Sequence, residues 1–286
     1  PARVAGVASI ADVSPAGPDG TLQPVQLATA ALLRVETIEI AGGAQAIAAL
    51  AYGTGSIEPV DKIVGPGNAW VTAAKLLVLG RCGIDLPAGP SEGMVVADAG
   101  ADARLVAADL AVQAEHGPDS PVWLVTADPG LADRVEAALP AFLAGLRTAD
   151  TFHAALGEYG RIVIAPDHRT ALEFARDYAP EHISFHTADP AADATAVPTA
   201  GSAYLGPWSA MAAGDYTTGA NHVLPTGGLA RAYGPLSVAD FGSWRQEQTL
   251  TAAGLASLRE TIVTLANAEG LPGHARNAAV RFEEER

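Results

Sequence analysis

The sequence predicts an α/β protein built around parallel sheets, and two observations support this. A strand, a glycine-rich turn and a helix recur in that order along the chain, which is typical of parallel βαβ units. The chain has 286 residues, 49% of them hydrophobic, which is enough to bury one large core or two of ordinary size. We therefore expect one or two α/β domains and no extensive disorder.

The first part of the chain contains three such repeats. The expected elements, in chain order, are strand 3–8, helix 22–33, strand 36–40, helix 46–52, strand 60–64 and helix 69–79. Residues 42–45 and 65–68 form the turns before the second and third helices, and Asn68 is placed as an N-cap. Free backbone amides at these helix starts can receive an anion. Neither turn has the glycine spacing of a dinucleotide fingerprint, and on turn chemistry alone an ordinary tight turn is the commoner case.

A second series of repeats follows an expected domain crossover at residues 84–92, which contain two prolines and a glycine. Its elements are strand 94–97, helix 103–115, strand 122–126, helix 131–146, strand 161–165, helix 169–178 and strand 183–186. Pro180 should end the last helix, because proline disfavours a helical conformation in the residue before it. Glu181 and His182 are therefore expected at a helix-to-strand corner, at the edge of the sheet.

The C-terminal part is less regular. Residues 213–226 are too rich in glycine, threonine and asparagine for a regular helix or strand, so we expect a loop that aims side chains. A short strand at 236–241 and a polar helix at 250–269 follow. The charged tail at 275–286 is expected to pack late or against another subunit.

Composition excludes several classes of partner. The formal net charge is −15 and the 17 Lys and Arg residues are scattered, which argues against nucleic acid or an anionic membrane as a main partner. The apolar runs are short and interrupted, so no segment is expected to span a bilayer and the protein is expected to be soluble. Cys82 is the only cysteine, which excludes an internal disulfide and favours a buried, small apolar role. The lone thiol and the absence of a secretory signal favour the cytoplasm.

Four of the seven histidines lie close to an acid and beside a turn: His116, His182, His222 and His274. Such recurrence favours one shared site over four coincidences. Each histidine alone also has a plain structural explanation, as a polar surface residue or as a favourable partner for a helix C-terminus.

The residues around these histidines suggest their chemistry. Gln113 and His116 lie three apart, hence on one face of a helix, and Asp215 lies near His222 in the loop. A carboxylate beside an imidazole suits either ligation of a metal such as zinc or proton transfer, and Gln113 would be an unusual metal ligand. Glu181 and His182 are a plausible acid–base pair. Ser91, at the crossover, could donate a hydrogen bond to a ligand or simply cap an exposed turn.

Six ordered motifs spanning nearly all of the chain resemble the histidinol dehydrogenase family. They are VDKIVGPGN (60–68), AGPSE (88–92), QAEH (113–116), APEH (179–182), GDY (214–216) with NHVLPT (221–226), and EGL (269–271) with His274. The resemblance implies an enzyme that uses zinc and NAD to oxidise L-histidinol, through L-histidinal, to L-histidine in histidine biosynthesis. It also implies an aldehyde-dehydrogenase-like fold of two incomplete Rossmann-like domains, at 1–91 and 92–235, with a C-terminal helical extension at 236–286.

The resemblance also assigns roles to individual residues. Zinc is expected to bind to Gln113, His116, Asp215 and His274. His182 is the expected general base, and Glu181 is expected to activate water for the second oxidation. The expected substrate contacts are Ser91, His182, His222, Glu269 and the four zinc ligands.

NAD is expected to contact Gln45 and Asn68. In the family, the C-terminal segment reaches the partner subunit, so Glu269 and His274 are expected to complete the site of a neighbouring copy in a homodimer. Cys82 does not match a catalytic thiol.

Some alternatives remain open at this point. Chains of the family begin well upstream, so we expect about the first third of the family fold to be absent. Residues 117–123 also resemble paralogues that oxidise other small primary alcohols such as sulfopropanediol. A zinc hydrolase would use the same donors without nicotinamide. A catalytically silent fragment would keep the motifs without activity.

Overall fold

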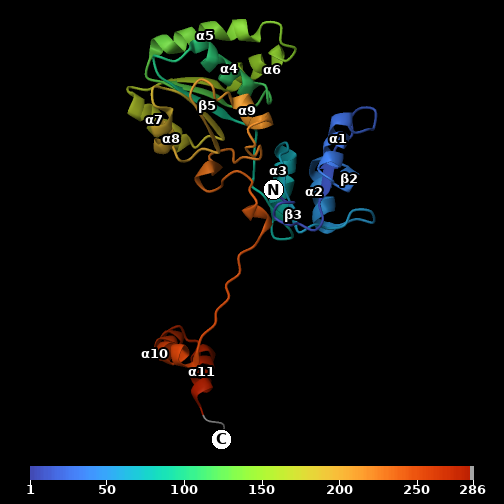
Figure 1. The fold of residues 1–286 in the computed structure, drawn as a ribbon, viewed down its shortest axis with the longest axis vertical. Helices are drawn as coiled ribbons and strands as arrows, with labels where there is room; N and C mark the ends of the chain where they lie inside the picture. The colour runs from blue at the N-terminus through green and yellow to red at the C-terminus, as the bar shows by residue number, and fades with distance from the viewer. Residues whose placement is uncertain (284–286) are drawn as a thin grey trace. The chain divides into compact units, whose positions relative to one another are not determined.

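A five-stranded parallel sheet is the largest feature of the computed structural model, which describes residues 1–283 (Figure 1). Its strand order is β7-β6-β5-β8-β9. The strands are β5 (Gly93–Ala97), β6 (Val122–Thr126), β7 (Gly160–Ile164), β8 (His182–His186) and β9 (Ser202–Leu205). Every residue of β5 and β8 is buried, as expected for parallel strands covered on both faces. The predicted α/β class with parallel sheets is confirmed.

Helices cover both faces of this sheet (Figure 1). One face carries α4 (Ala103–Ala114), α5 (Pro129–Leu143) and α6 (Ala149–Tyr159), and the other carries α7 (His168–Tyr178) and α8 (Pro190–Ala196). Side chains alternate between the two layers along β5: Val95 belongs to the α4 layer, and Met94 and Val96 belong to the α7 layer. The central strands are therefore fixed in register by two separate cores.

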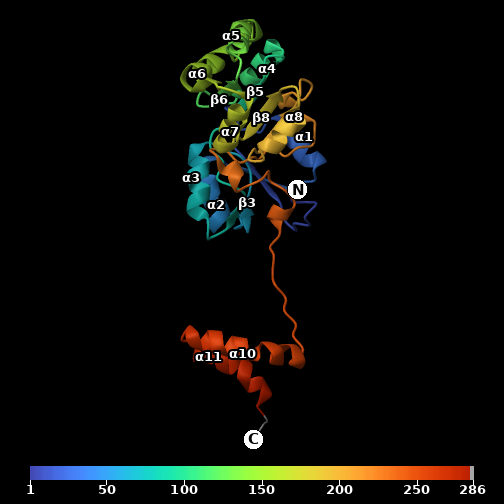
Figure 2. The same cartoon turned by 90° about the vertical axis from the view of Figure 1, so that its left-hand side faces the viewer.

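Two smaller parallel sheets lie in the first part of the chain. They pair β1 (Ala11–Ser14) with β2 (Thr37–Ile40), and β3 (Lys62–Ile63) with β4 (Gly83–Ile84). The helices here are α1 (Pro24–Leu32), α2 (Gly43–Tyr52) and α3 (Ala69–Val78), and α2 lies beside α3 (Figure 2). Both helices contribute to a small core that includes Cys82. The expected buried role of this cysteine is confirmed.

The strand predicted at residues 3–8 is wrong. These residues form a turn closed by local hydrogen bonds from Ala5 N to Pro1 O and from Val7 N to Ala2 O, and Gly6 has φ of +81°. The strand lies at β1 instead, because that segment pairs with β2 over its whole length.

The expectation of an irregular loop at residues 213–226 is wrong in its first part. Helix α9 (Met211–Tyr216) includes Asp215. The missing side chain of Gly214 is the reason a helix fits here, because a Cβ atom at this position would collide with the Tyr204 ring. Residues 217–226 contain no helix or strand.

The strand predicted at 236–241 is also wrong. The Asp240 carboxylate accepts hydrogen bonds from Ser237 N at 2.6 Å and Ser237 Oγ at 2.9 Å, and this local turn leads into the short 3-10 helix Ala239–Phe241. Such side-chain hydrogen bonds compete with strand pairing. A second 3-10 helix spans Leu229–Arg231.

The described residues divide into two compact units, 1–242 and 243–283. The second unit contains α10 (Ala252–Ala268), α11 (Pro272–Ala279) and the 3-10 helix Val280–Phe282. Residues 284–286 of the predicted tail lie outside the described residues. The predicted domain boundary at 91/92, within the first unit, stays a prediction. None of the described helices combines the length and hydropathy needed to cross a lipid bilayer.

Candidate active site

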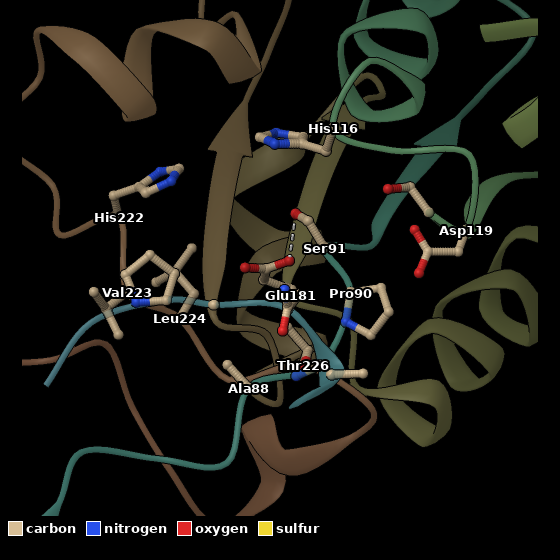
Figure 3. A pocket seen from close by; sticks show the side chains of 16 residues that line it. Ala88, Pro90, Ser91, His116, Asp119, Glu181, His222, Val223, Leu224 and Thr226 are labelled. Atoms are coloured by element: carbon tan, nitrogen blue, oxygen red, sulfur yellow. Dashed lines mark hydrogen bonds between the residues drawn. The ribbon is translucent and has the colours of Figure 1, made fainter. Parts of the chain in front are cut away.

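A cavity of about 420 Å³ opens at one edge of the five-stranded sheet (Figure 3). Its walls come from the segments 66–69, 88–91, 116–120 and 222–226, together with Glu181. At this edge β5 and β8 begin and α4 ends. Residues at the beginnings of these strands and at the end of the helix therefore surround the cavity. Glu181 lines it from the position directly before β8, the helix-to-strand corner predicted from the sequence.

Ser91 connects two of the predicted site residues. Its Oγ donates a hydrogen bond of 2.7 Å to Glu181 Oε2 and accepts one of 2.9 Å from Gln113 Nε2. The backbone N of Glu92 donates to the same Glu181 oxygen at 2.9 Å. Gln113 and Glu181 are buried. The structure thus brings three separate motifs into one polar network. Within it, Glu181 Oε2 accepts two hydrogen bonds.

His182 is 3% exposed and lies beside this network. Its Nδ1 is 3.5 Å from Glu181 Oε2, too long for an ordinary hydrogen bond, and has no partner among the described residues. Burial alone would lower the pKa of His182, but contact with the Glu181 carboxylate and the charge of Asp215 raise it above its usual value. A buried imidazole with a free ring nitrogen is suited to exchanging a proton with a bound molecule.

His116 and His222, which line the cavity, form a second group with Asp215. His222 Nδ1 is 3.0 Å from Asp215 Oδ1, and the rings of His116 and His222 are 6.4 Å apart between centroids. Desolvation lowers the pKa of His116, and the nearby Asp215 carboxylate only partly offsets it. A lowered pKa keeps the imidazole neutral near pH 7, the form that binds metal ions.

The chemistry of these donors fits zinc. The first unit supplies an imidazole from His116, a carboxylate from Asp215 and an amide from Gln113, all groups with a free oxygen or nitrogen lone pair. Within residues 1–283, no three His, Cys, Asp or Glu side chains are grouped closely enough to hold a metal ion by themselves. Of the four predicted zinc ligands, only His116 and Asp215 are side chains of these four types in the first unit.

Gly93 makes room for Gln113, and this gives a testable prediction. A Cβ atom at residue 93 would lie 2.5 Å from Gln113 Cγ and 2.9 Å from its Oε1. We expect Gly93→Ala to displace the amide, to cost about 1–3 kcal/mol in free energy of unfolding and to weaken zinc binding. Denaturant unfolding and zinc titration measure both effects. Gly157→Ala is the matched control, because a Cβ atom there meets nothing within 4 Å. Unchanged zinc affinity in Gly93→Ala would contradict the prediction that Gln113 binds zinc in the space that Gly93 leaves.

The two residues predicted to contact NAD differ in position. Asn68 lines the cavity, and its Oδ1 accepts hydrogen bonds from Trp70 N and Val71 N, both at 3.1 Å, so the predicted N-cap is confirmed. Gln45 is exposed in the first turn of α2 and is not among the residues that line the cavity. Its contact with NAD stays a prediction.

Glu269 and His274 lie in the second unit. Glu269 is the C-cap of α10 and His274 is in the first turn of α11, and both are exposed. Their predicted roles in zinc and substrate binding stay predictions.

No role was predicted for Glu92, which the structure places behind the site. Its carboxylate accepts hydrogen bonds from Tyr178 Oη at 2.7 Å and from Gly227 N at 2.9 Å, and burial raises its pKa. This side chain anchors the end of the segment that carries His222. A charged residue directly before a fully apolar strand was the only available signal.

Comparisons with known proteins agree with the motifs. Residues 1–282 match the family model described as histidinol dehydrogenase. The chain is 48% identical over 286 residues to histidinol dehydrogenase of Halobacterium salinarum, covering 100% of this chain and 67% of that protein. It is 47% identical over 281 residues to that of Thermus thermophilus, covering 98% of this chain and 67% of that protein.

A solved structure agrees as well. The crystal structure of histidinol dehydrogenase from Elizabethkingia anophelis matches with a TM-score of 0.89 and 38% identity, over 94% of this chain and 62% of that chain. The chain thus spans about two thirds of the length of these relatives. All three relatives carry the same name, so they give no support to the sulfopropanediol alternative.

Proposed function

Because the chain belongs to the histidinol dehydrogenase family, we propose that it carries the catalytic residues for oxidation of L-histidinol, through L-histidinal, to L-histidine with NAD and zinc. The observation that carries this proposal is the polar network of Ser91 and Glu181, which line the cavity, with the buried side chains of Gln113 and His182 next to them. It combines a base, a second carboxylate and polar side chains that can orient a small alcohol. We further propose a cytoplasmic homodimer.

Zinc would be held by Gln113, His116 and Asp215, with His274 of the partner subunit as the fourth ligand. When bound, zinc supplies a positive charge that orients the substrate and NAD supplies the hydride acceptor for both oxidations. Ser91, His222 and Glu269 would contact the substrate, and Gln45 and Asn68 would contact NAD.

The remaining chemistry depends on two neighbouring side chains. Neutral His182 takes the hydroxyl proton of the substrate as hydride leaves the carbinol carbon, so the base must be unprotonated at the start of each turnover. Glu181 then takes a proton from the water that adds to the aldehyde. Its position, 3.5 Å from His182 Nδ1, lets its charge stabilise the imidazolium formed in the first step.

The pKa of His182 gives a prediction for the pH profile. Only neutral His182 is active, so kcat/KM should rise as pH increases through the pKa of His182. Glu181 raises that pKa, so Glu181→Gln should lower it and move the rising limb of the profile to lower pH. Profiles of kcat/KM, each scaled to its own maximum, measure the shift. Glu173→Gln, on α7 and outside the cavity lining, should leave the limb in place. A limb that moves to higher pH would contradict this coupling.

The direct test of function is NADH production from L-histidinol by the purified, zinc-loaded protein. We expect about two NADH for each histidinol consumed, because the proposal contains two successive hydride transfers. No rise in NADH absorbance would reject the proposal. A zinc hydrolase would act without nicotinamide and would gain no thermal protection from NAD.

A further inference from the structure

Asp109 is a buried carboxylate on α4 that lies outside the cavity lining and has no part in the proposed chemistry. It is 6% exposed. Its Oδ2 accepts hydrogen bonds from Ser184 Oγ at 2.8 Å and from His186 Nε2 at 2.9 Å. Its Oδ1 accepts a longer one, of 3.4 Å, from Met211 N. One carboxylate therefore connects helix α4 to strand β8 and to the first residue of helix α9.

These three elements carry most of the proposed site. On α4, Gln113 lies one helical turn beyond Asp109, on the same face, and His116 follows the end of the helix. On β8, His182 is two positions before Ser184, so both side chains lie on the same face of the sheet. On α9, Asp215 is four residues after Met211. The three hydrogen bonds to Asp109 thus join α4, which carries Gln113 and leads to His116, to the two elements that hold Asp215 and the proposed base.

Because Asp109 is buried, its hydrogen bonds restrict movement of α4 relative to β8 and α9. A buried carboxylate is costly unless its oxygens are hydrogen-bonded, so a shift of α4 relative to β8 or α9 would leave a charge without a partner. The apolar cluster on this face contains Val106 and Leu110 of α4, Tyr204 of β9 and Met211 of α9, and apolar contacts alone allow small slides between elements. Hydrogen bonds to a single carboxylate depend on direction, so they do not allow such slides.

We propose that Asp109 is a positioning residue that sets the placement of Gln113 and His116 relative to Asp215 and His182, and so tunes zinc affinity. The inference rests on the proposed function, since it takes these residues as the zinc and proton-transfer groups. Asp109 touches neither substrate nor cofactor. Its effect acts through the elements that it connects, as polar groups behind metal ligands commonly do.

The test compares Asp109→Asn with Asp193→Asn in the purified protein. Asp193 is a matched control because it is 7% exposed and also accepts hydrogen bonds from one histidine and one hydroxyl, His168 Nε2 at 2.9 Å and Thr187 Oγ1 at 2.6 Å. It lies on α8, in the layer on the opposite face of the sheet from α4. Competition with a chromophoric zinc chelator measures affinity, and circular dichroism measures the melting temperature.

We expect Asp109→Asn to weaken zinc binding about 10- to 100-fold and Asp193→Asn to leave it within about threefold of wild type. Saturating zinc should recover most of kcat for Asp109→Asn, and the Asp193→Asn control separates this effect from a general loss of stability. Equal zinc affinities for Asp109→Asn, Asp193→Asn and wild type would overturn the inference. Wild-type protein that neither binds zinc nor oxidises histidinol would instead overturn the proposed function.

Ser184→Ala keeps the test decisive if Asp109→Asn does not fold. This substitution removes one of the three donors and leaves those from His186 and Met211. We expect a zinc affinity lowered several-fold, on the order of 3- to 10-fold, with a far-ultraviolet spectrum like that of wild type. An affinity equal to that of Asp193→Asn would overturn the inference.

Discussion

Replacing His182 with asparagine is expected to lower kcat for histidinol oxidation about 10²- to 10⁴-fold, the usual contribution of a general base. Asparagine cannot take the hydroxyl proton at neutral pH, whereas the buried imidazole has a raised pKa and an Nδ1 that no described residue hydrogen-bonds. Zinc content should stay at the wild-type level, because His182 is not among the proposed ligands. Steady-state NADH production and metal analysis measure the two effects separately.

A histidine without an assigned role provides the control for this experiment. His153 is exposed on α6, and His153→Asn should leave kcat unchanged. Circular dichroism should show that both variants are folded. A His182→Asn enzyme that retains more than about a tenth of wild-type kcat would contradict the assignment of His182 as the base.

Replacing Asp85 with alanine is expected to destabilise the protein by about 3–5 kcal/mol, because it leaves a buried lysine without its counter-ion. The side chains of Asp85 and Lys75 are 0% and 4% exposed and form an ion pair. Lys75 Nζ also donates to Gly65 O at 3.0 Å, and Gly65 N donates to Asp85 Oδ2 at 2.7 Å. The pair therefore holds the start of the turn that leads to Asn68.

The same substitution should raise the KM for NAD more than the KM for histidinol, since Asn68 is a proposed NAD contact and not a substrate contact. Denaturant unfolding gives the stability change, and initial rates give the two KM values. Glu173→Gln, which breaks an exposed ion pair with Arg169 one turn apart on α7, should cost no more than about 0.5 kcal/mol. A loss below about 1 kcal/mol for Asp85→Ala would show that the buried pair does not stabilise this fold.

Much of the large sheet could be predicted from local sequence. β5 and β6 are short, mostly apolar runs that follow turns, and β8 is a short run in which polar and apolar residues alternate; each is fully or largely buried. β9 and the helices α6 and α8 were missed. β9 has only four residues, two of them exposed, and it is a strand because it pairs with β8. Such pairing is a tertiary effect that a local pattern does not contain.

The two strands that were predicted wrongly also show that a local sequence pattern does not determine strand pairing. Residues 3–8 and 236–241 have apolar residues at suitable spacing, yet neither segment pairs with a strand within residues 1–283. Local hydrogen bonds form instead, within residues 1–7 and between Ser237 and Asp240. Where no neighbouring strand supplies donors and acceptors, short-range hydrogen bonds decide the backbone conformation.

Some of the motifs that meet at the cavity could be recognised in the sequence, but their geometry was only partly predictable. Motif spacing indicated Gln113 with His116 and Glu181 with His182, and the structure joins Gln113 to Glu181 through Ser91. The buried acids Glu92 and Asp109 belong to no motif spacing of this kind. A single acid in a helix resembles any surface residue until its tertiary partners are known, so the role of Asp109 could not be predicted from sequence.

The most direct test of the central claim is to locate zinc by anomalous diffraction in crystals of the zinc-loaded protein. We expect one zinc peak bonded to the side chains of Gln113, His116 and Asp215, with His182 beside it but not bonded to it. A zinc ion bound elsewhere, or one that lacks any of these three side chains, would contradict the account.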